Sequence, residues 1–206
     1  VPGVDMERLL KLCLVHDPAY VDEIFRLGNT DTPVHLDGDT LMGSHSLNAA
    51  LRAAGAVILG VDLVLAGKNN QVFCSVRPPG HHAERKRAMG FCIFNNVAIG
   101  AAYALRQYQL QRVAIVDFDV HHGNGTEDIF RGNPHVLFCS TFQHPFYPYS
   151  GDETEEQNIV NLPLPAATAG TAFREAVSQY WLERIDSFKP ELVLISAGFD
   201  GHVEDD

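Results

Sequence analysis

Apolar and polar positions alternate along the chain in blocks that predict helices and strands in turn. Short runs rich in Val, Ile, Leu and Phe, bounded by turn-forming residues, are typical of buried strands. Such runs predict strands over residues 72–76, 112–119, 135–141 and 192–197. Helical periodicity, with Pro18 in a first turn and Gly67 after a last turn, predicts helices over residues 17–27, 45–66, 95–108, 126–130 and 171–188.

The order of these elements predicts the fold class. Helices that alternate with strands are typical of a mostly parallel central sheet covered by helices on both faces, so we expect a three-layer α/β domain. The polar, turn-rich segment 29–43 is expected to be a loop, and the acidic run DETEEQ (152–157) an exposed connection. No internal repeat or linker divides the chain, which predicts a single domain over residues 1–206.

Acidic residues and histidines follow one predicted strand directly. In IVDFDVHHGNGT (115–126), strand alternation places Asp117, Asp119 and His121 on one side, whereas His122 falls on or after the turn. A carboxylate and an imidazole two residues apart can converge on one divalent cation. The alternative is an acidic strand end with solvated histidines, which two further motifs argue against.

These two motifs also follow predicted strands. RPPGHHAERKRAMGFC (77–92) places His81 and His82 side by side after a Pro-Pro-Gly turn, a pair that suggests acid–base chemistry beside a metal. PELVLISAGFDGH (190–202) ends its strand at Gly198 and Asp200, a candidate third ligand. Because open α/β sheets build their sites at the carboxyl ends of parallel strands, the three motifs are expected to meet.

Composition and charge narrow the function classes. The 206 residues, 46% of them hydrophobic, suffice for one large core. The formal net charge of −11 argues against nonspecific nucleic-acid binding and is compatible with cationic substrates. The four cysteines lack metal-type spacing, which predicts reduced thiols in a cytoplasmic protein. No stretch reads as a membrane span or a signal peptide, so no membrane partner is expected.

With these motifs, the chain resembles the histone deacetylase superfamily, within the arginase-deacetylase fold, and is most similar to bacterial members with class II-like motifs. The resemblance covers roughly residues 18–206. It implies zinc ligands at Asp119, His121 and Asp200, with Fe²⁺ as an alternative metal. It also implies that His81 and His82 are the tandem catalytic histidines.

The same resemblance implies partners for these histidines. Asp117 matches the aspartate that pairs with His81, and Asn124 stands where class I members carry an aspartate behind His82. An amide can orient an imidazole but supplies no negative charge, so His82 is expected to be less basic than beside a carboxylate.

A substrate tunnel is implied as well. The resemblance places Gly90 and Phe91 on one wall and Tyr147 on the opposite wall, where a Phe would be more usual. Asp39 resembles the rim aspartate that grips the substrate backbone, although an ordinary turn aspartate remains an equal alternative.

The family also implies structural potassium. One ion would lie near Asp117, backbone carbonyls of Asp119 and His121, and Ser140 with Thr141. A second would use backbone carbonyls of residues 130, 133 and 136. The alternative for Ser140 is a strand-end hydroxyl that caps its neighbour.

The expected function is zinc-dependent removal of acetyl or acyl groups from lysine side chains of peptides or proteins. An acetylpolyamine deacetylase and a non-catalytic acyl-lysine binding protein remain alternatives, and oligomerisation is left open. A binuclear manganese hydrolase of the arginase type needs two further carboxylates, where this chain has Gly123 and His202.

The resemblance implies that this domain is incomplete at both ends. The family's following glycine-rich loop carries a Tyr or His that hydrogen-bonds the substrate carbonyl, and no residue of this chain can be assigned to that role. Losing such a donor costs on the order of a hundredfold to a thousandfold in rate, so we expect residues 1–206 alone to be nearly inactive.

Overall fold

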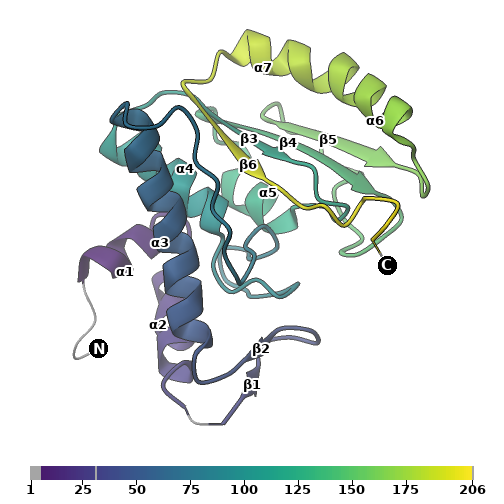
Figure 1. Ribbon diagram of the computed structural model, residues 1–206. Helices are drawn as coiled ribbons and strands as arrows, with labels where there is room; N and C mark the ends of the chain where they lie inside the picture. Colours follow the sequence, from purple (N-terminus) through teal and green to yellow (C-terminus); the bar gives the residue numbers. More distant parts are fainter. Residues whose placement is uncertain (1–5, 31, 206) are drawn as a thin grey trace.

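A four-stranded sheet forms the centre of the computed structural model, which describes residues 6–30 and 32–205 (Figure 1). The strand order is β5 (Ile159–Leu164), β4 (Val136–Gln143), β3 (Val113–Asp117) and β6 (Leu192–Ser196). Each neighbouring pair is parallel, and Asp117 at the end of β3 lies level with Ser140 of β4 and Ser196 of β6. The carboxyl ends of these strands therefore meet at one edge.

Helices cover both faces of this sheet, as the sequence predicts. One face carries the helical segments of the predicted 171–188 helix, and the other carries the helices that surround the double-histidine motif (Figure 1). The first group is α6 (Gly170–Val177), the π-helical turn η1 (Ser178–Leu182) and α7 (Glu183–Phe188). The second group is α4 (Asn96–Gln107) and α5 (Asn124–Phe130), with α3 (Ser46–Leu65) packed on α4.

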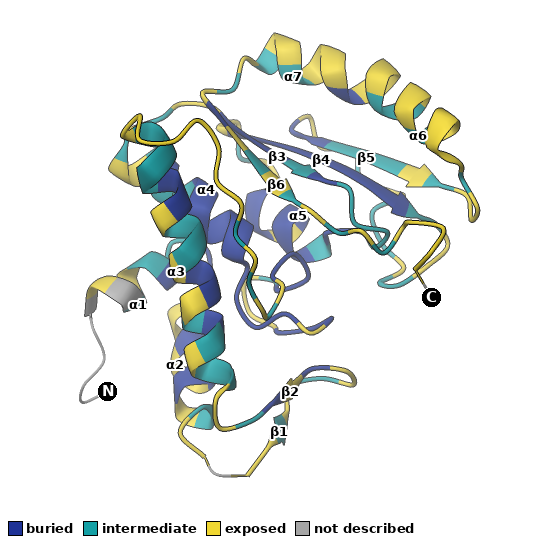
Figure 2. Ribbon diagram, in the orientation of Figure 1, coloured by how far each residue is buried: buried dark blue, intermediate teal, exposed yellow. Residues whose placement is uncertain are grey.

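The central strands are buried on both faces because helices lie on both. Ile115 and Phe138 belong to the larger core on the α4 face, whereas Ala114 and Leu137 pack around the buried Trp181 on the other face. This division follows the alternation of side chains along a strand. Figure 2 shows β3 and β4 as buried for nearly their whole length.

The N-terminal part forms helices and a small hairpin beside α3 (Figure 1). These elements are α1 (Met6–Leu12), α2 (Pro18–Leu27), β1 (Val34–His35) and β2 (Leu41–Met42). At the start of α2, the Asp17 carboxylate accepts the Ala19 N–H at 2.9 Å and Pro18 occupies the first turn, as predicted.

Some predicted elements are wrong. Residues 72–76 are not a strand: no described strand pairs with them, and Phe73 is 76% exposed. An apolar run becomes a strand only where a neighbouring strand takes up its backbone hydrogen bonds. In the four-stranded sheet β6 is the last strand on its side, and residues 72–76 do not pair with it. The predicted loop 29–43 contains the β1–β2 hairpin, and α1 and β5 were not predicted.

Helix α3 corrects the expectation that no stretch could cross a membrane. Its 20 residues, with a mean hydropathy of 1.6, are long and apolar enough by length and composition alone. In the structure it packs against α4, and its buried residues are Ala50, Ala53, Ala54, Gly60 and Val61. A single helix of this kind is weak support for a membrane span, because packed helices of soluble proteins pass the same test.

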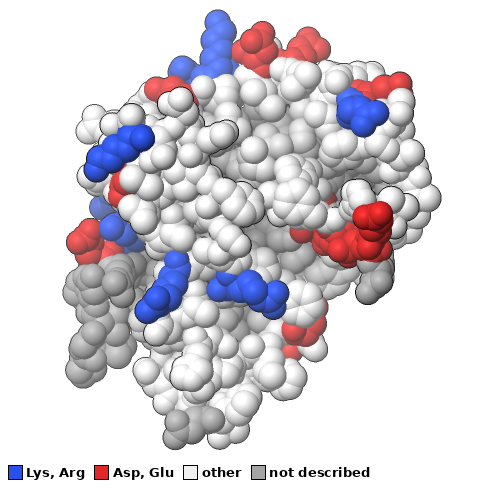
Figure 3. Space-filling view, in the orientation of Figure 1, with Lys and Arg blue, Asp and Glu red and all other residues white. Residues whose placement is uncertain are grey.

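Charged side chains are distributed unevenly over the face that Figure 3 shows. Lys and Arg occur at several places on this face, and one group of Asp and Glu lies near the C-terminal end of the described chain.

A buried histidine joins the N-terminal helices to the double-histidine segment. His16 is 2% exposed; its Nδ1 lies 2.9 Å from the Glu84 carbonyl, and its Nε2 accepts the Asn95 backbone N–H at 3.0 Å. Because a backbone N–H only donates, Nε2 carries the lone pair and Nδ1 the proton. Burial lowers the pKa of His16 to about 4, so the imidazole is neutral at pH 7.

We expect His16 to destabilise the folded chain as the pH falls from 6.5 toward 4. The unfolded chain takes up this proton near pH 6.5, but the folded chain only near pH 4. The contribution is therefore fully present above pH 6.5 and is lost on acidification. The interval between the two pKa values corresponds to roughly 3 kcal/mol. Denaturant unfolding at pH 7.5 and 4.5 should show a smaller loss of unfolding free energy for His16→Gln than for wild type.

The exposed His45 provides the matched control. His45→Gln should lose as much unfolding free energy on acidification as the wild type does. Equal losses in wild type and His16→Gln would contradict the role given to His16.

Candidate functional site

Three chain segments meet at the carboxyl edge of the sheet. The segment after β3 carries Asp119 and His121, the segment after β6 carries Asp200, and the loop before α4 carries His81 and His82. The ring centroids of His82 and His121 are 5.9 Å apart, which places the double-histidine loop in contact with the segment after β3. The sequence expectation that the motifs meet is therefore correct for these residues.

Asp119, His121 and Asp200 form a compact group with ligand atoms within 4.8 Å of one another. Nδ1 of His121 faces both carboxylates, at 2.9 Å from Asp119 Oδ1 and 3.1 Å from Asp200 Oδ2. Hydrogen bonds from His121 to these two carboxylates raise the pKa of His121 to about 9. Burial opposes the charged form of Asp119, but its bond with His121 and the charge of His81 hold its pKa at about 2. One imidazole and two convergent carboxylates fit a single divalent cation.

Two glycines let the backbone approach this group. A Cβ on Gly198 would lie 2.1 Å from Asp119 Oδ2, and one on Gly123 would lie 2.4 Å from Asp117 Oδ2. No side chain fits at either position without moving a carboxylate. The close approach at Gly123 also argues against a second-metal carboxylate there, which supports a mononuclear centre.

His81 is held by a buried carboxylate. Its Nδ1 lies 2.9 Å from Asp117 Oδ2, and Asp117 is fully buried. Burial disfavours the imidazolium, but the charge of Asp117 and its hydrogen bond outweigh this and raise the pKa of His81 to about 9. His81 can therefore carry a positive charge at pH 7 beside the candidate metal ligands.

His82 has the opposite character. Its Nδ1 lies 2.8 Å from Asn124 Oδ1, and its ring centroid is 4.0 Å from that of His81. Burial and the charge of His81 lower the pKa of His82 to about 3. The hydrogen bond with Asn124 raises the pKa of His82, but burial and the charge of His81 lower it by more. The comparison with a carboxylate at position 124 stays a prediction.

The predicted tunnel residues lie around this histidine pair. The Tyr147 ring centroid is 5.2 Å from that of His82 and 6.0 Å from that of His121. Its hydroxyl is buried without a partner among the described residues, and burial raises its pKa to about 12. Phe91, 64% exposed, lies on the segment that contacts His82: a Cβ on Gly90 would come within 2.3 Å of that ring.

Asp39 and Thr40 hold the backbone of the segment that carries Gly90 and Phe91, which are predicted to line one wall of a tunnel. Its Oδ1 accepts the Gly90 N–H at 3.1 Å, and the neighbouring Thr40 hydroxyl accepts the Phe91 N–H at 3.0 Å. Gly90 and Phe91 both have positive φ angles, +56° and +64°, and for Phe91 this conformation is unfavourable. Asp39 is thus more than an ordinary turn aspartate: with Thr40, it holds the backbone at Gly90 and Phe91. Its contact with a substrate stays a prediction.

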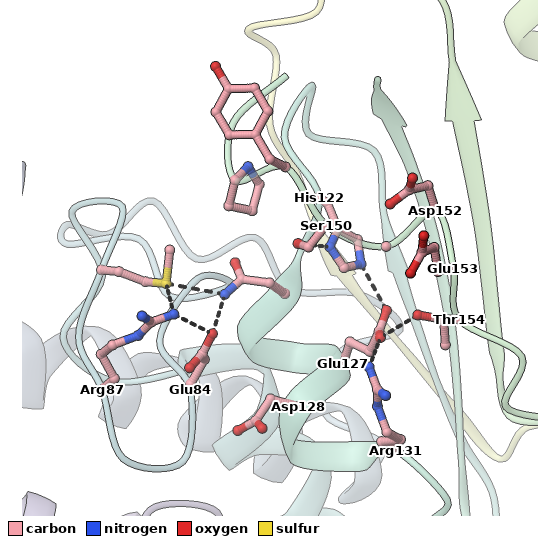
Figure 4. Close-up of a pocket in the computed structure, with 15 residues that line it drawn as sticks. Glu84, Arg87, His122, Glu127, Asp128, Arg131, Ser150, Asp152, Glu153 and Thr154 are labelled. Carbon is pink, nitrogen blue, oxygen red and sulfur yellow. Dashed lines mark hydrogen bonds and ion pairs between the residues drawn. The ribbon is translucent and has the colours of Figure 1, made fainter. Parts of the chain in front are cut away.

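Sequence reasoning missed two sets of contacts. Phe146 stacks on His121 with ring centroids 5.1 Å apart. His122, the buried neighbour of the candidate ligand His121, bonds the Ser150 hydroxyl and Glu127, each at 2.9 Å. Glu127 also accepts from Arg131, Thr154 and Asn161. Figure 4 shows His122, Glu127, Arg131, Ser150 and Thr154 on one side of a pocket. A His directly after a ligand His, with Glu five residues later, was the available signal.

The structure bears differently on the two predicted potassium sites. The Ser140 and Thr141 hydroxyls are buried without partners among the described residues, which fits a cation that would accept them as ligands. At the second position, the Asn158 amide nitrogen already donates to the carbonyls of Phe130 (2.8 Å) and Val136 (3.0 Å). A carbonyl oxygen has two lone pairs, so these hydrogen bonds do not test the second potassium site, which stays a prediction.

Similarity to known proteins identifies the family. The family model described as histone deacetylase domain matches residues 6–206. This chain belongs to the histone deacetylase family. Histone deacetylase 14, chloroplastic, of Arabidopsis thaliana is 41% identical over 207 residues, which cover 93% of this chain and 49% of that protein.

Two crystal structures share the fold of this histone deacetylase chain. The HDA15 HD domain has a TM-score of 0.89 and 35% identity, and the match covers 95% of this chain and 58% of that one. Acetylpolyamine aminohydrolase from Burkholderia pseudomallei has a TM-score of 0.84 and 29% identity, over 96% of this chain and 68% of that one. The α/β fold predicted from the sequence is thereby confirmed. The chain spans about half the length of the Arabidopsis relative.

Proposed function

We propose that this protein is a zinc-dependent deacetylase that hydrolyses the acetyl amide bond of acetylated lysine side chains. The observation that carries this proposal is the meeting of Asp119, His121 and Asp200 beside a histidine pair, in a chain of the histone deacetylase family. Zinc suits this ligand set, and Fe²⁺ would accept it as well.

The protein side of the reaction falls mainly to the histidine pair. When bound, zinc would polarise the amide carbonyl and lower the pKa of a coordinated water. His82, neutral at pH 7, would accept a proton from the attacking water and return it to the leaving amine. His81, kept protonated by Asp117, would stabilise the negative charge that develops on the carbonyl oxygen.

Other residues would shape the site rather than move protons. Phe91 and Tyr147 would flank a flexible aliphatic arm, with Asp39 and Thr40 fixing the first wall. The unpartnered hydroxyls of Ser140 and Thr141 support one structural potassium ion near Asp117.

The cysteines support the proposal of a reducing, cytoplasmic location. All of them are free thiols: Cys13, Cys74, Cys92 and Cys139.

An acetylpolyamine deacetylase is the alternative, favoured by the similarity to the Burkholderia acetylpolyamine aminohydrolase. Both functions use the same zinc chemistry and differ in the substrate that enters the tunnel. We expect the full-length protein to turn over an acetyl-lysine peptide with a kcat/KM about tenfold or more above that for N-acetylputrescine. Steady-state assays of both substrates with zinc bound decide the order.

The reverse order would replace the lysine proposal with the polyamine alternative. Turnover of neither substrate by the zinc-loaded full-length protein would contradict both. That result would favour a non-catalytic protein that binds acyl-lysine.

A further inference from the structure

A carboxylate stands behind Asn124 on the side away from His82. Asn124 Oδ1 lies 2.8 Å from His82 Nδ1, and its Nδ2 donates to Glu84 Oε1, also at 2.8 Å. The three side chains thus form a continuous chain of hydrogen bonds from the imidazole to Glu84. Glu84 has no part in the proposed metal binding or proton transfer.

The surroundings of Glu84 fix which way the Asn124 amide faces. An ionised carboxylate only accepts hydrogen bonds, and the second neighbour of Nδ2, the Met89 sulfur at 3.3 Å, is also an acceptor. The amide nitrogen must therefore face Glu84 and Met89. Figure 4 shows Glu84 beside Arg87 on one wall of the pocket. Arg87 donates to the same Glu84 oxygen at 2.9 Å and so leaves it an acceptor.

This orientation determines the proton position on His82. With the amide nitrogen turned to Glu84, the oxygen faces His82 Nδ1, so Nδ1 must carry the hydrogen. In a neutral imidazole the lone pair then lies on Nε2. Because Nδ1 is the nitrogen bonded to Asn124, Nε2 is left for other partners. The centroid of the His82 ring is 4.0 Å from that of His81 and 5.9 Å from that of His121. The lone pair on Nε2 is therefore a proton acceptor on a ring that lies near the candidate metal ligand His121.

Glu84 is also held by its backbone. Its carbonyl accepts from the buried His16, and its N–H donates to the Arg87 carbonyl at 2.9 Å. The Glu84–Arg87 ion pair itself is a surface contact, with Arg87 59% exposed, and such pairs contribute little to stability. The position of the carboxylate is therefore better explained by Asn124 than by Arg87.

We propose that Glu84 is a positioning residue: it fixes the Asn124 amide and through it selects the Nδ1–H tautomer of His82. The role of that tautomer in deacetylation rests on the proposed function. The tautomer itself does not, because it can be observed without turnover.

The test exchanges an acceptor for a donor at position 84. Long-range ¹H–¹⁵N spectra of the ¹⁵N-histidine-labelled, zinc-loaded protein report the tautomer of each imidazole, with His82 assigned by its loss in His82→Ala. Glu84→Gln keeps an acceptor oxygen and should retain Nδ1–H. Glu84→Lys only donates, so the Asn124 amide should flip and His82 should populate Nε2–H. Glu84→Arg makes the same exchange with another side chain and decides the matter if Glu84→Lys does not fold.

Kinetics of the full-length protein provide the second measurement. Glu84→Lys should lower kcat by about a hundredfold with a much smaller change in KM, because a catalytic histidine in the wrong tautomer is a poor base. Adding Asn124→Asp should restore most of kcat, since a carboxylate at position 124 can accept from the introduced ammonium group and from His82 together. Glu175→Lys, the same charge change at an exposed position of α6, should leave the tautomer and kcat unchanged.

The outcomes separate the two proposals. An unchanged Nδ1–H tautomer in Glu84→Lys and Glu84→Arg would overturn the positioning role, whatever the activity. A changed tautomer in a protein that hydrolyses no acetyl amide would support the positioning role and contradict the proposed function.

Discussion

Replacing Asp200 by Ala should remove nearly all transition metal from the protein. The wild type should bind one zinc per chain, because one imidazole and two carboxylates converge and Gly123 leaves no room for a second-site carboxylate. Without Asp200, the two remaining ligands, Asp119 and His121, come from one short segment, and two ligands do not complete a zinc site. Metal content after dialysis, measured by elemental analysis, should fall from about one to near zero.

A matched control distinguishes ligation from general loss of acidic charge. Asp186, exposed on α7, can be replaced by Ala and should leave the metal content at one. Stoichiometric metal in Asp200→Ala would show that another residue is the third ligand. Two transition ions per wild-type chain would contradict the mononuclear centre.

The grouping of the candidate metal ligands was predictable because their positions follow from local rules. Alternation along β3 and its continuation orders Asp117, Asp119 and His121, and parallel strands bring their carboxyl ends to one edge. The structure adds what alternation does not: Asp117 turns away from the ligand group to hold His81. Whether Asp117 joins the ligand group or pairs with His81 depends on where the double-histidine loop packs, and no local sequence pattern specifies this packing.

The wrong predictions have a common physical origin in long-range pairing. Residues 72–76 have a strand-like composition, but a strand requires a partner, and none of the described strands lies beside them. Strand β5 was missed because Pro163 interrupts its pattern; it lies at the sheet edge, where Pro is tolerated. In both cases the presence or absence of a neighbouring strand determined whether the segment is a strand, and a neighbouring strand can be distant in sequence.

Glu84 could not be recognised from the sequence for a similar reason. In the run AERKR it looks like one of several solvated charges, and its partner Asn124 lies 40 residues away. Asp39 is comparable: its donor, the Gly90 N–H, is 51 residues distant. Contacts of this kind position the predicted groups, but only the folded chain brings them together.

Replacing His82 by Ala in the full-length protein should lower kcat by about a hundredfold to ten-thousandfold while zinc stays bound, because a general base contributes in that range and His82 is not a metal ligand. His81→Ala should cost less in rate, since its role is electrostatic. It should cost more in stability, because it leaves the buried Asp117 carboxylate without its partner. Zinc content, kcat and thermal unfolding of both variants separate these effects.

The exposed His45→Ala serves as the control and should match the wild type in all three measurements. The assignment depends on the asymmetry between the two imidazoles: Asp117 raises the pKa of His81, whereas burial and His81 lower that of His82. At pH 7 only His82 then has a free lone pair to accept a proton. If His81→Ala proves inactive with zinc bound while His82→Ala retains turnover within about tenfold of wild type, the two roles are reversed. The base would then be the imidazole that Asp117 supports.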